Sequence, residues 1–334
     1  MTNSKTLYPV KVHGRYGYID NEGKLCIEPQ FDYAEEFKGE LAPVSIGNYS
    51  GFIDKEGKTA VKIEYDDIYD FSEGLVLVEL NGKKGYADSE GNLKIQNIYD
   101  DGNSFSEGLA AVKIGYRWGY IDKDGNMIIE PHFIDAYSFS EGLALVQTGG
   151  KLGYIDKKGN IIIEPQYDYA YGFSEGLAAV LIKNKYGYID KKGSIAIKAE
   201  YYTADDFSEG LAAVECDDKY GFIAADGNMA IQRKYDWADD FDEGYAAVAE
   251  GDKYGFIDKN GNEIIPPKFE NVDTISEGLF CVQAGGKWGY IDKDCNFIIK
   301  PVFDEASKFD HGIAKVTYEQ KLCYINKKGE FIWK

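Results

Sequence analysis

The side chain with the clearest sequence context for nucleophilic chemistry is Ser174. It stands at the centre of GFSEG, residues 172–176, which satisfies the GxSxG pattern of a hydrolase nucleophile. Equivalent segments elsewhere in the chain read DFSEG at Asp70, SFSEG at Ser104 and DFSEG at Asp206, so the leading glycine is not part of a recurring motif. No strand-to-helix elbow follows, although the hydrolase motif requires one. We therefore interpret the match as accidental.

Candidates for metal or acid–base chemistry are equally sparse. DKDGN, residues 122–126, has the start of a calcium loop, but equivalent segments carry Lys158 and Lys192 where the second ligand should stand. A hairpin turn explains this segment better. The histidines lie far apart at unrelated positions, which favours exposed or rim histidines over a triad or zinc site. They are His13, His132 and His311.

Nucleotide binding has no support either, because no glycine-rich phosphate loop stands between a strand and a helix. The sequence thus predicts no catalytic residue, no metal site and no cofactor, and we expect the protein not to be an enzyme.

Composition excludes several further classes. Of 334 residues, 37 are Lys or Arg and 57 are Asp or Glu, giving a net charge of −20 that disfavours direct binding to nucleic acid or to an anionic membrane. No apolar run approaches the roughly 20 residues of a membrane span. The N-terminal segment lacks the features of a secretory signal, so we expect a cytoplasmic location. The cysteines are odd in number and scattered, as reduced thiols would be, at Cys26, Cys216, Cys281, Cys295 and Cys323.

The elements that must position any site come from an internal repeat with a period of 34 residues. It is marked by an apolar or aromatic residue at every thirty-fourth position: Leu41, Leu75, Leu109, Leu143, Leu177, Leu211, Tyr245, Leu279 and Ile313. We predict an N-terminal cap over residues 1–7 and a single array over 8–334. The array holds nine full modules and a truncated tenth, 314–334. We number the positions of each module 1 to 34, starting from Tyr8.

Each module is expected to contain three β-strands and no helix. The first strand spans positions 34 to 4, the second spans positions 8 to 13, and a short third surrounds position 20. Between the last two strands, DKxG at positions 13 to 16 predicts a type I turn followed by a left-handed glycine. The return segment, positions 21 to 33, is irregular, and its aromatic positions 24 and 30 are predicted core residues.

One module buries too little apolar surface to fold alone, so neighbouring modules must stack. Propeller blades usually have four strands over about 40 residues or more, and these modules leave room for only three. We therefore predict an all-β fold, an open β-solenoid or superhelix of three-stranded hairpin repeats. A closed toroid or β-propeller of the same modules is the alternative.

The recurring strings include RWGYIDKDGNMIIEP, KWGYIDKDCNFIIKP and KLGYIDKKGNIIIEP, with FSEGLAAV at the module boundaries. They resemble the WG repeat family of bacterial proteins over essentially the whole chain, although the tryptophan itself remains only at Trp118 and Trp288. The resemblance implies a β-hairpin repeat array similar in kind to cell-wall-binding repeats. It implies no catalytic residues, since most members lack an assigned activity.

Charged residues also recur, with Asp at position 13, Asp at position 25, Glu at position 32 and Lys or Arg at position 8. We favour turn capping with compensating charge from position 8 over a recognition surface. Positions 26 and 28 flank a small residue and are predicted to point outward, where aromatic rings could anchor a partner or pack on the next module. These candidate partner-binding residues are Tyr33, Tyr69, Tyr137, Tyr169, Tyr171 and Trp237.

The leading hypothesis for function is a non-catalytic scaffold that binds a protein partner through an extended acidic and aromatic surface. The alternative is an acidic inhibitor that mimics nucleic acid and occupies the basic groove of another protein. A third hypothesis, carbohydrate or cell-wall binding through the same rings, follows from the family resemblance. Its weakness is the missing secretory signal.

Overall fold

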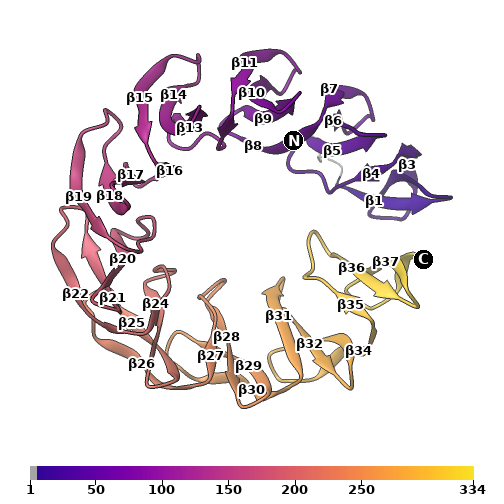
Figure 1. The fold of residues 1–334 in the computed structure, drawn as a ribbon. Coiled ribbons are helices and arrows are strands. Elements are labelled where there is room, and N and C mark those ends of the chain that lie inside the picture. Colours follow the sequence, from indigo (N-terminus) through magenta and orange to yellow (C-terminus); the bar gives the residue numbers. More distant parts are fainter. Residues whose placement is uncertain (1–5) are drawn as a thin grey trace, which may run out of the picture. The chain divides into compact units, whose positions relative to one another are not determined.

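The computed structural model describes residues 6–334 (Figure 1). The named secondary-structure elements in these residues are all β-strands. The predicted cap, residues 1–7, lies mostly outside the described residues. No helix in the described part of the chain could cross a membrane. The chain divides into two compact units, which end and begin at Gly172 and Phe173.

The first unit contains five sheets within its described residues. Their strands are β1 (Leu7–Val12), β2 (Arg15–Asp20), β3 (Leu25–Phe31), β4 (Tyr33–Ala34), β5 (Leu41–Ile46), β6 (Tyr49–Asp54), β7 (Thr59–Tyr65), β8 (Asp67–Ser72), β9 (Leu75–Leu80), β10 (Lys83–Asp88), β11 (Leu93–Tyr99), β12 (Asp101–Gly102), β13 (Leu109–Ile114), β14 (Arg117–Asp122), β15 (Met127–Phe133), β16 (Asp135–Ser140), β17 (Leu143–Thr148), β18 (Lys151–Ile155) and β19 (Ile161–Tyr167).

The second unit also contains five sheets, all of them fully described. Their strands are β20 (Leu177–Ile182), β21 (Lys185–Asp190), β22 (Ile195–Tyr201), β23 (Thr203–Ala204), β24 (Leu211–Cys216), β25 (Lys219–Ala224), β26 (Met229–Tyr235), β27 (Trp237–Ala238), β28 (Tyr245–Glu250), β29 (Lys253–Asp258), β30 (Glu263–Phe269), β31 (Asn271–Ser276), β32 (Leu279–Ala284), β33 (Lys287–Ile291), β34 (Phe297–Phe303), β35 (Glu305–Ala306), β36 (Ile313–Tyr318), β37 (Lys321–Asn326) and β38 (Phe331–Trp333).

Each sheet is an antiparallel meander in chain order, such as β12-β13-β14-β15. Eight of the sheets in residues 6–334 have four strands, while β1–β3 and β20–β22 form three-stranded sheets. Within each unit the sheets follow one another along an arc, with the first strands on its concave side and the last strands on its convex side (Figure 1). Separate four-stranded meanders are the blades of a β-propeller.

The expected solenoid of three-stranded modules is therefore wrong, and the β-propeller named as the alternative is confirmed. The return segment was the source of the error, because it supplies the first strand of the next sheet. Four strands fit into 34 residues because the turns are short. At Glu107 and Gly108, for example, φ angles of 52° and 88° give the two left-handed residues of a type I′ hairpin.

The core lies between neighbouring sheets, as the predicted dependence on stacking requires. Tyr120, at position 11, is fully buried and packs edge-on against Phe139 of the next sheet with ring centroids 5.0 Å apart. Phe133, at position 24, lies in the same buried cluster. The aromatic positions predicted to fill the core are thus confirmed.

Serine and glutamate of the FSEG segment join consecutive sheets. The Ser106 hydroxyl donates to the carbonyl oxygen of Phe139 at 2.6 Å, and Glu107 accepts the Gly142 N–H at 3.0 Å. Lys157 forms an ion pair with Glu107 at 3.0 Å. The same contacts recur elsewhere in the repeat, so the position-32 glutamate caps the turn of the next sheet and not its own.

Aspartates at positions 13 and 25 have similar structural roles. The Asp122 carboxylate accepts the N–H groups of Asp124 and Asn126 at 3.0 and 2.8 Å, as predicted for a turn cap. Asp100 forms an ion pair with Lys83 of one sheet at 2.5 Å and accepts the Gly115 N–H of the next at 2.6 Å. The recurring charges therefore serve the fold, and position 8 supplies the predicted compensation.

Candidate functional site

The side chains that the sequence offered for catalysis or metal binding make structural contacts instead. The Ser174 hydroxyl donates to the Phe207 carbonyl oxygen at 2.7 Å, which is the contact between sheets described for Ser106. Among the histidines, His311 lies 2.9 Å from Asp310 in an exposed pair, and His132 contacts its own strand at the Glu130 carbonyl. Within residues 6–334 the structure brings together no group of three or more side chains suited to a metal ion.

The predicted partner-binding residues lie on or beside the first strands of the sheets, and five of the six are exposed. Tyr69 is the exception, because it is half-buried under the ammonium group of Lys84, 4.6 Å from the ring centroid. The exposed fractions of the others are 52% for Tyr33, 44% for Tyr137, 62% for Tyr169, 47% for Tyr171 and 39% for Trp237.

The backbone beneath two of these exposed rings is fixed by a buried tyrosine. The Tyr120 hydroxyl donates to the carbonyl oxygen of Tyr137 at 2.8 Å, and that of Tyr154 donates to Tyr171 at 2.7 Å. Burial, and then the charge of Asp135, raise the pKa of the Tyr120 hydroxyl well above its usual range. The Tyr120 hydroxyl therefore stays a proton donor at neutral pH, and the two hydrogen bonds fix the backbone of position 28 at Tyr137 and Tyr171.

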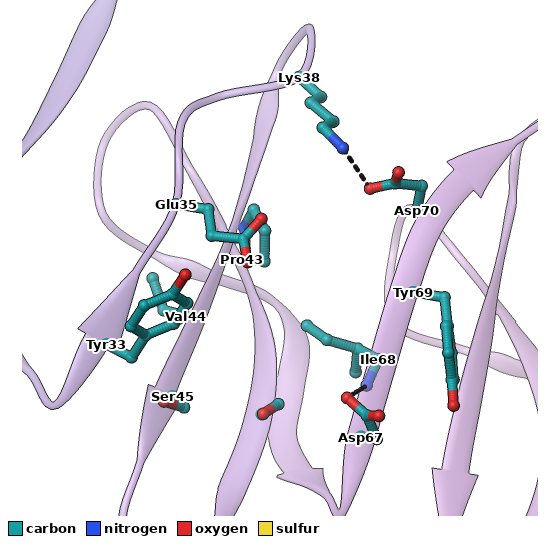
Figure 2. Close-up of a pocket in the computed structure, with 11 residues that line it drawn as sticks. Tyr33, Glu35, Lys38, Pro43, Val44, Ser45, Asp67, Ile68, Tyr69 and Asp70 are labelled. Carbon is teal, nitrogen blue, oxygen red and sulfur yellow. Dashed lines mark hydrogen bonds and ion pairs between the residues drawn. The ribbon is translucent and has the colours of Figure 1, made fainter. Parts of the chain in front are cut away.

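A pocket of about 390 Å³ lies between the first strands β4 and β8 (Figure 2). Tyr33 and Glu35 stand on one side of it and Asp67 and Tyr69 on the other, and Lys38 bridges to Asp70 at 2.5 Å. Partial burial, and then the charge of Glu35, raise the pKa of Tyr33. The floor is formed by Pro43, Val44, Ser45 and Ser50.

A smaller pocket of about 200 Å³ occupies the equivalent place between β27 and β31 in the second unit. Its walls include the rings of Trp237, Tyr245 and Phe256. Its carboxylates are those of Asp239, Asp240, Asp242 and Asp273.

Carboxylates cluster around this smaller pocket, and within residues 6–334 none of them forms an ion pair with a lysine. Partial burial in the concave surface, and then the charges of Asp205, Asp239 and Asp206, raise the pKa of Asp240 to about 6. Burial likewise raises the pKa of Asp205 and of Asp206. This group of like charges contrasts with the paired carboxylates at positions 25 and 32.

The sequence predicted Tyr33 and Tyr69 of the larger pocket and Trp237 of the smaller one, but not the rest of their lining, which includes the rings of Tyr245 and Phe256. The sequence does mark the places of the pockets, because the residues there differ from those usual at their repeat positions. Lys38 and Asp242 replace the position-31 serine that links neighbouring sheets, and Ser50 replaces the ring or long side chain of position 9. Pockets lie where these substitutions remove a contact between first strands, and only the structure shows which positions face one another.

The repeated meanders, packed through shared aromatic cores, define an all-β repeat protein of the β-propeller class. The chain belongs to the WG containing repeat family, whose description matches nine consecutive segments: residues 16–49, 51–83, 85–118, 118–151, 153–186, 186–220, 220–254, 254–288 and 288–321. The resemblance inferred from the repeated strings is thereby confirmed. No curated protein matches the chain.

Solved structures match this chain in fold alone. The structure described as "Crystal structure of the eukaryotic initiation factor" has a TM-score of 0.59 at 11% identity, over 99% of this chain and 95% of that one. Hsv2p of Kluyveromyces lactis matches with a TM-score of 0.41 at 11% identity, over 75% and 92% of the two chains. The dihydro-heme d1 dehydrogenase NirN matches with a TM-score of 0.42 at 13% identity, over 97% and 75%.

Proposed function

We propose that this protein is a non-catalytic scaffold that binds a protein partner through the aromatic side chains of positions 26 and 28. One observation carries the proposal: five of these rings are exposed at repeated positions, and buried tyrosines hold the backbone of position 28 at Tyr137 and Tyr171. Rigid, exposed aromatic side chains lose little conformational entropy on binding and are the commonest anchors of protein interfaces.

The test is affinity capture from the native cell with identification of bound proteins by mass spectrometry. The wild type is compared with the double variant Tyr137→Ala/Tyr171→Ala and with Tyr116→Ala, which removes a ring that is 91% exposed on a hairpin tip. We expect a partner that wild type and Tyr116→Ala retain and the double variant loses. Equal capture by all three proteins would refute aromatic anchoring.

The acidic inhibitor remains a second candidate because of one observation in the second unit. Six carboxylates on and beside its first strands form no ion pair with a basic side chain of residues 6–334. They belong to Asp205, Asp206, Asp239, Asp240, Asp242 and Asp273. A salt series separates the candidates, since capture that falls steeply between about 50 and 500 mM salt supports the inhibitor, and salt-insensitive capture supports aromatic anchoring.

A further inference from the structure

The larger pocket, between β4 and β8, is opened by two departures from the repeat. At position 31, where Ser106 donates to the next sheet, Lys38 stands instead and reaches Asp70 across the pocket (Figure 2). At position 9 the small Ser50 replaces a longer side chain. In the sheet β27–β30 that position holds Tyr254, whose ring centroid lies 5.9 Å from Trp237.

Trp237 occupies the same repeat position as Tyr33, so the comparison shows what Ser50 leaves uncovered. Tyr33 packs edge-on against Tyr16 of the preceding sheet, with ring centroids 5.9 Å apart, and Ser50 supplies no ring from its own sheet. With serine there, the side chain of Tyr33 remains 52% exposed and forms one wall of an open pocket.

The charges of this pocket do not balance within the described chain. Lys38 neutralises Asp70, but Glu35 and Asp67 form no ion pair with a basic side chain in residues 6–334. Asp67 accepts only the N–H of its neighbour Ile68 at 2.9 Å. Glu35 beside the half-exposed ring of Tyr33, with Asp67 across the pocket, attracts a cation both by charge and by the negative face of the ring.

We propose that the pocket between β4 and β8 receives a positively charged side chain of the protein partner, with arginine preferred over lysine. The inference rests on the proposed function, because it names the chemistry that a partner must present. Arginine fits better since its planar guanidinium would stack on Tyr33 while donating to the neighbouring Glu35, and Asp67 on the opposite side of the pocket adds attraction by charge. The neighbouring ring of Tyr69 already holds such a cation, the ammonium group of Lys84.

The test uses the full chain and needs no partner. The probe is the blocked tripeptide acetyl-Gly-Arg-Gly-amide, followed by the methyl NMR signals of Val44 and Ile68, which line the pocket. We expect both signals to shift and saturate, with a dissociation constant on the order of 1 mM. The same peptide with citrulline, which is neutral and nearly isosteric, should bind at least about tenfold more weakly.

Matched variants locate the binding. Ser50→Tyr restores the ring typical of the repeat and should abolish the shifts, whereas Ser50→Ala leaves the pocket open and should preserve them. Glu35→Gln and Asp67→Asn should each weaken binding several-fold. Asp124→Asn, which removes one charge from an exposed turn of the same unit, should have no effect. Should Ser50→Tyr not fold, the two charge variants decide alone.

Three results would overturn the inference: equal binding of the citrulline peptide, unchanged binding by folded Ser50→Tyr, or equal weakening by Asp124→Asn. None of these bears on partner capture, which tests the scaffold through Tyr137 and Tyr171. If capture persists while the arginine peptide fails to bind, the inference is wrong and the proposed function stands. If the peptide binds but capture does not depend on the rings, the proposed function fails.

Discussion

At the scale of single residues, the serine and glutamate of FSEG bind one sheet to the next, although FSEG lies within the segment that resembles a hydrolase motif. The glutamates adopt positive φ, near 52° at Glu107, which costs about 1 kcal/mol for a residue other than glycine. That cost is offset because the carboxylate in this position reaches both an N–H of the next turn and a lysine. Glycine or asparagine would suit the turn but could not make these contacts.

Replacing Ser106 with alanine should destabilise the protein without exposing any core side chain. The hydroxyl donates to a backbone carbonyl of the next sheet at 2.6 Å, and losing such a bond costs about 1 kcal/mol. The measurement is urea unfolding, with Ser104→Ala as the control in the same segment. Equal stability loss in both variants would contradict a specific role for the Ser106 hydroxyl.

Cys295 offers a second prediction at this scale. It has φ of 62° at position 16, where the other described modules have a glycine with positive φ. Cys295→Gly should remove the strain of the left-handed conformation and raise stability, by about 1 kcal/mol or less, because glycine also gains entropy in the unfolded chain. Thermal unfolding of the two proteins checks this, and a lower melting temperature for the variant would refute it.

At the scale of the sheet, the glycine of the WG dipeptide permits the close crossing of the third and fourth strands. A Cβ atom at Gly119 would lie 2.4 Å from the backbone oxygen of Ile129, an overlap that only a backbone shift can relieve. The register slips beside this residue, between Trp118 and Tyr120, so β15 bends over β14. The glycine of the motif is therefore required because the two strands approach too closely for a side chain.

Gly119→Ala should accordingly cost about 3 kcal/mol or more, the upper range of overpacking effects. The control is Gly172→Ala, whose Cβ would have no neighbour closer than 4.0 Å and whose φ is not in the left-handed range. Denaturant unfolding followed by tryptophan fluorescence compares the two. A stability loss of similar size in both variants would show that glycine content, and not the crossing, is responsible.

At the scale of the whole molecule, which has a net charge of −20, some carboxylates are paired with lysines and others are clustered together. The two kinds make the stability of the fold depend on pH in opposite ways. Hydrogen bonding with Lys259, together with the N–H of Gly244, lowers the pKa of Glu209, so its contribution to stability is present above its unfolded pKa and is lost as the pH falls. Asp240 behaves in the opposite way, because its pKa is raised to about 6 from an ordinary value of 3.8. Between these two pKa values the folded state binds more protons at Asp240 than the unfolded state does, so the free energy of unfolding falls as the pH rises.

Asp240→Asn should therefore raise the free energy of unfolding at pH 7 and change it little near pH 4. Solvent screens this exposed carboxylate, which limits the gain to about 1 kcal/mol or less. The control is Asp252→Asn, which removes the same charge from an exposed hairpin tip. Denaturation curves at both pH values test the prediction, and an equal gain at pH 7 in both variants would attribute the effect to net charge alone.

The sequence by itself determined the repeat, its exact register, the buried rings of positions 11, 24 and 30 and the turn at DKxG. These features follow from local chemistry and from spacing, which recur unchanged along the chain. It also identified the rings at positions 26 and 28, five of which are exposed. It failed at the return segment, whose short strand is visible only through its pairing with the strand that follows.

Only the tertiary structure decided where departures from the repeat meet. Ser50 and Lys38 are separated by a full hairpin in the sequence, yet both line the pocket that Tyr33 and Tyr69 flank (Figure 2). Likewise, a glutamate and the glycine 35 residues later are joined by a hydrogen bond that no local pattern contains. Such contacts depend on how one sheet packs on the next. A pattern within one module does not show which residues of two neighbouring sheets come close together.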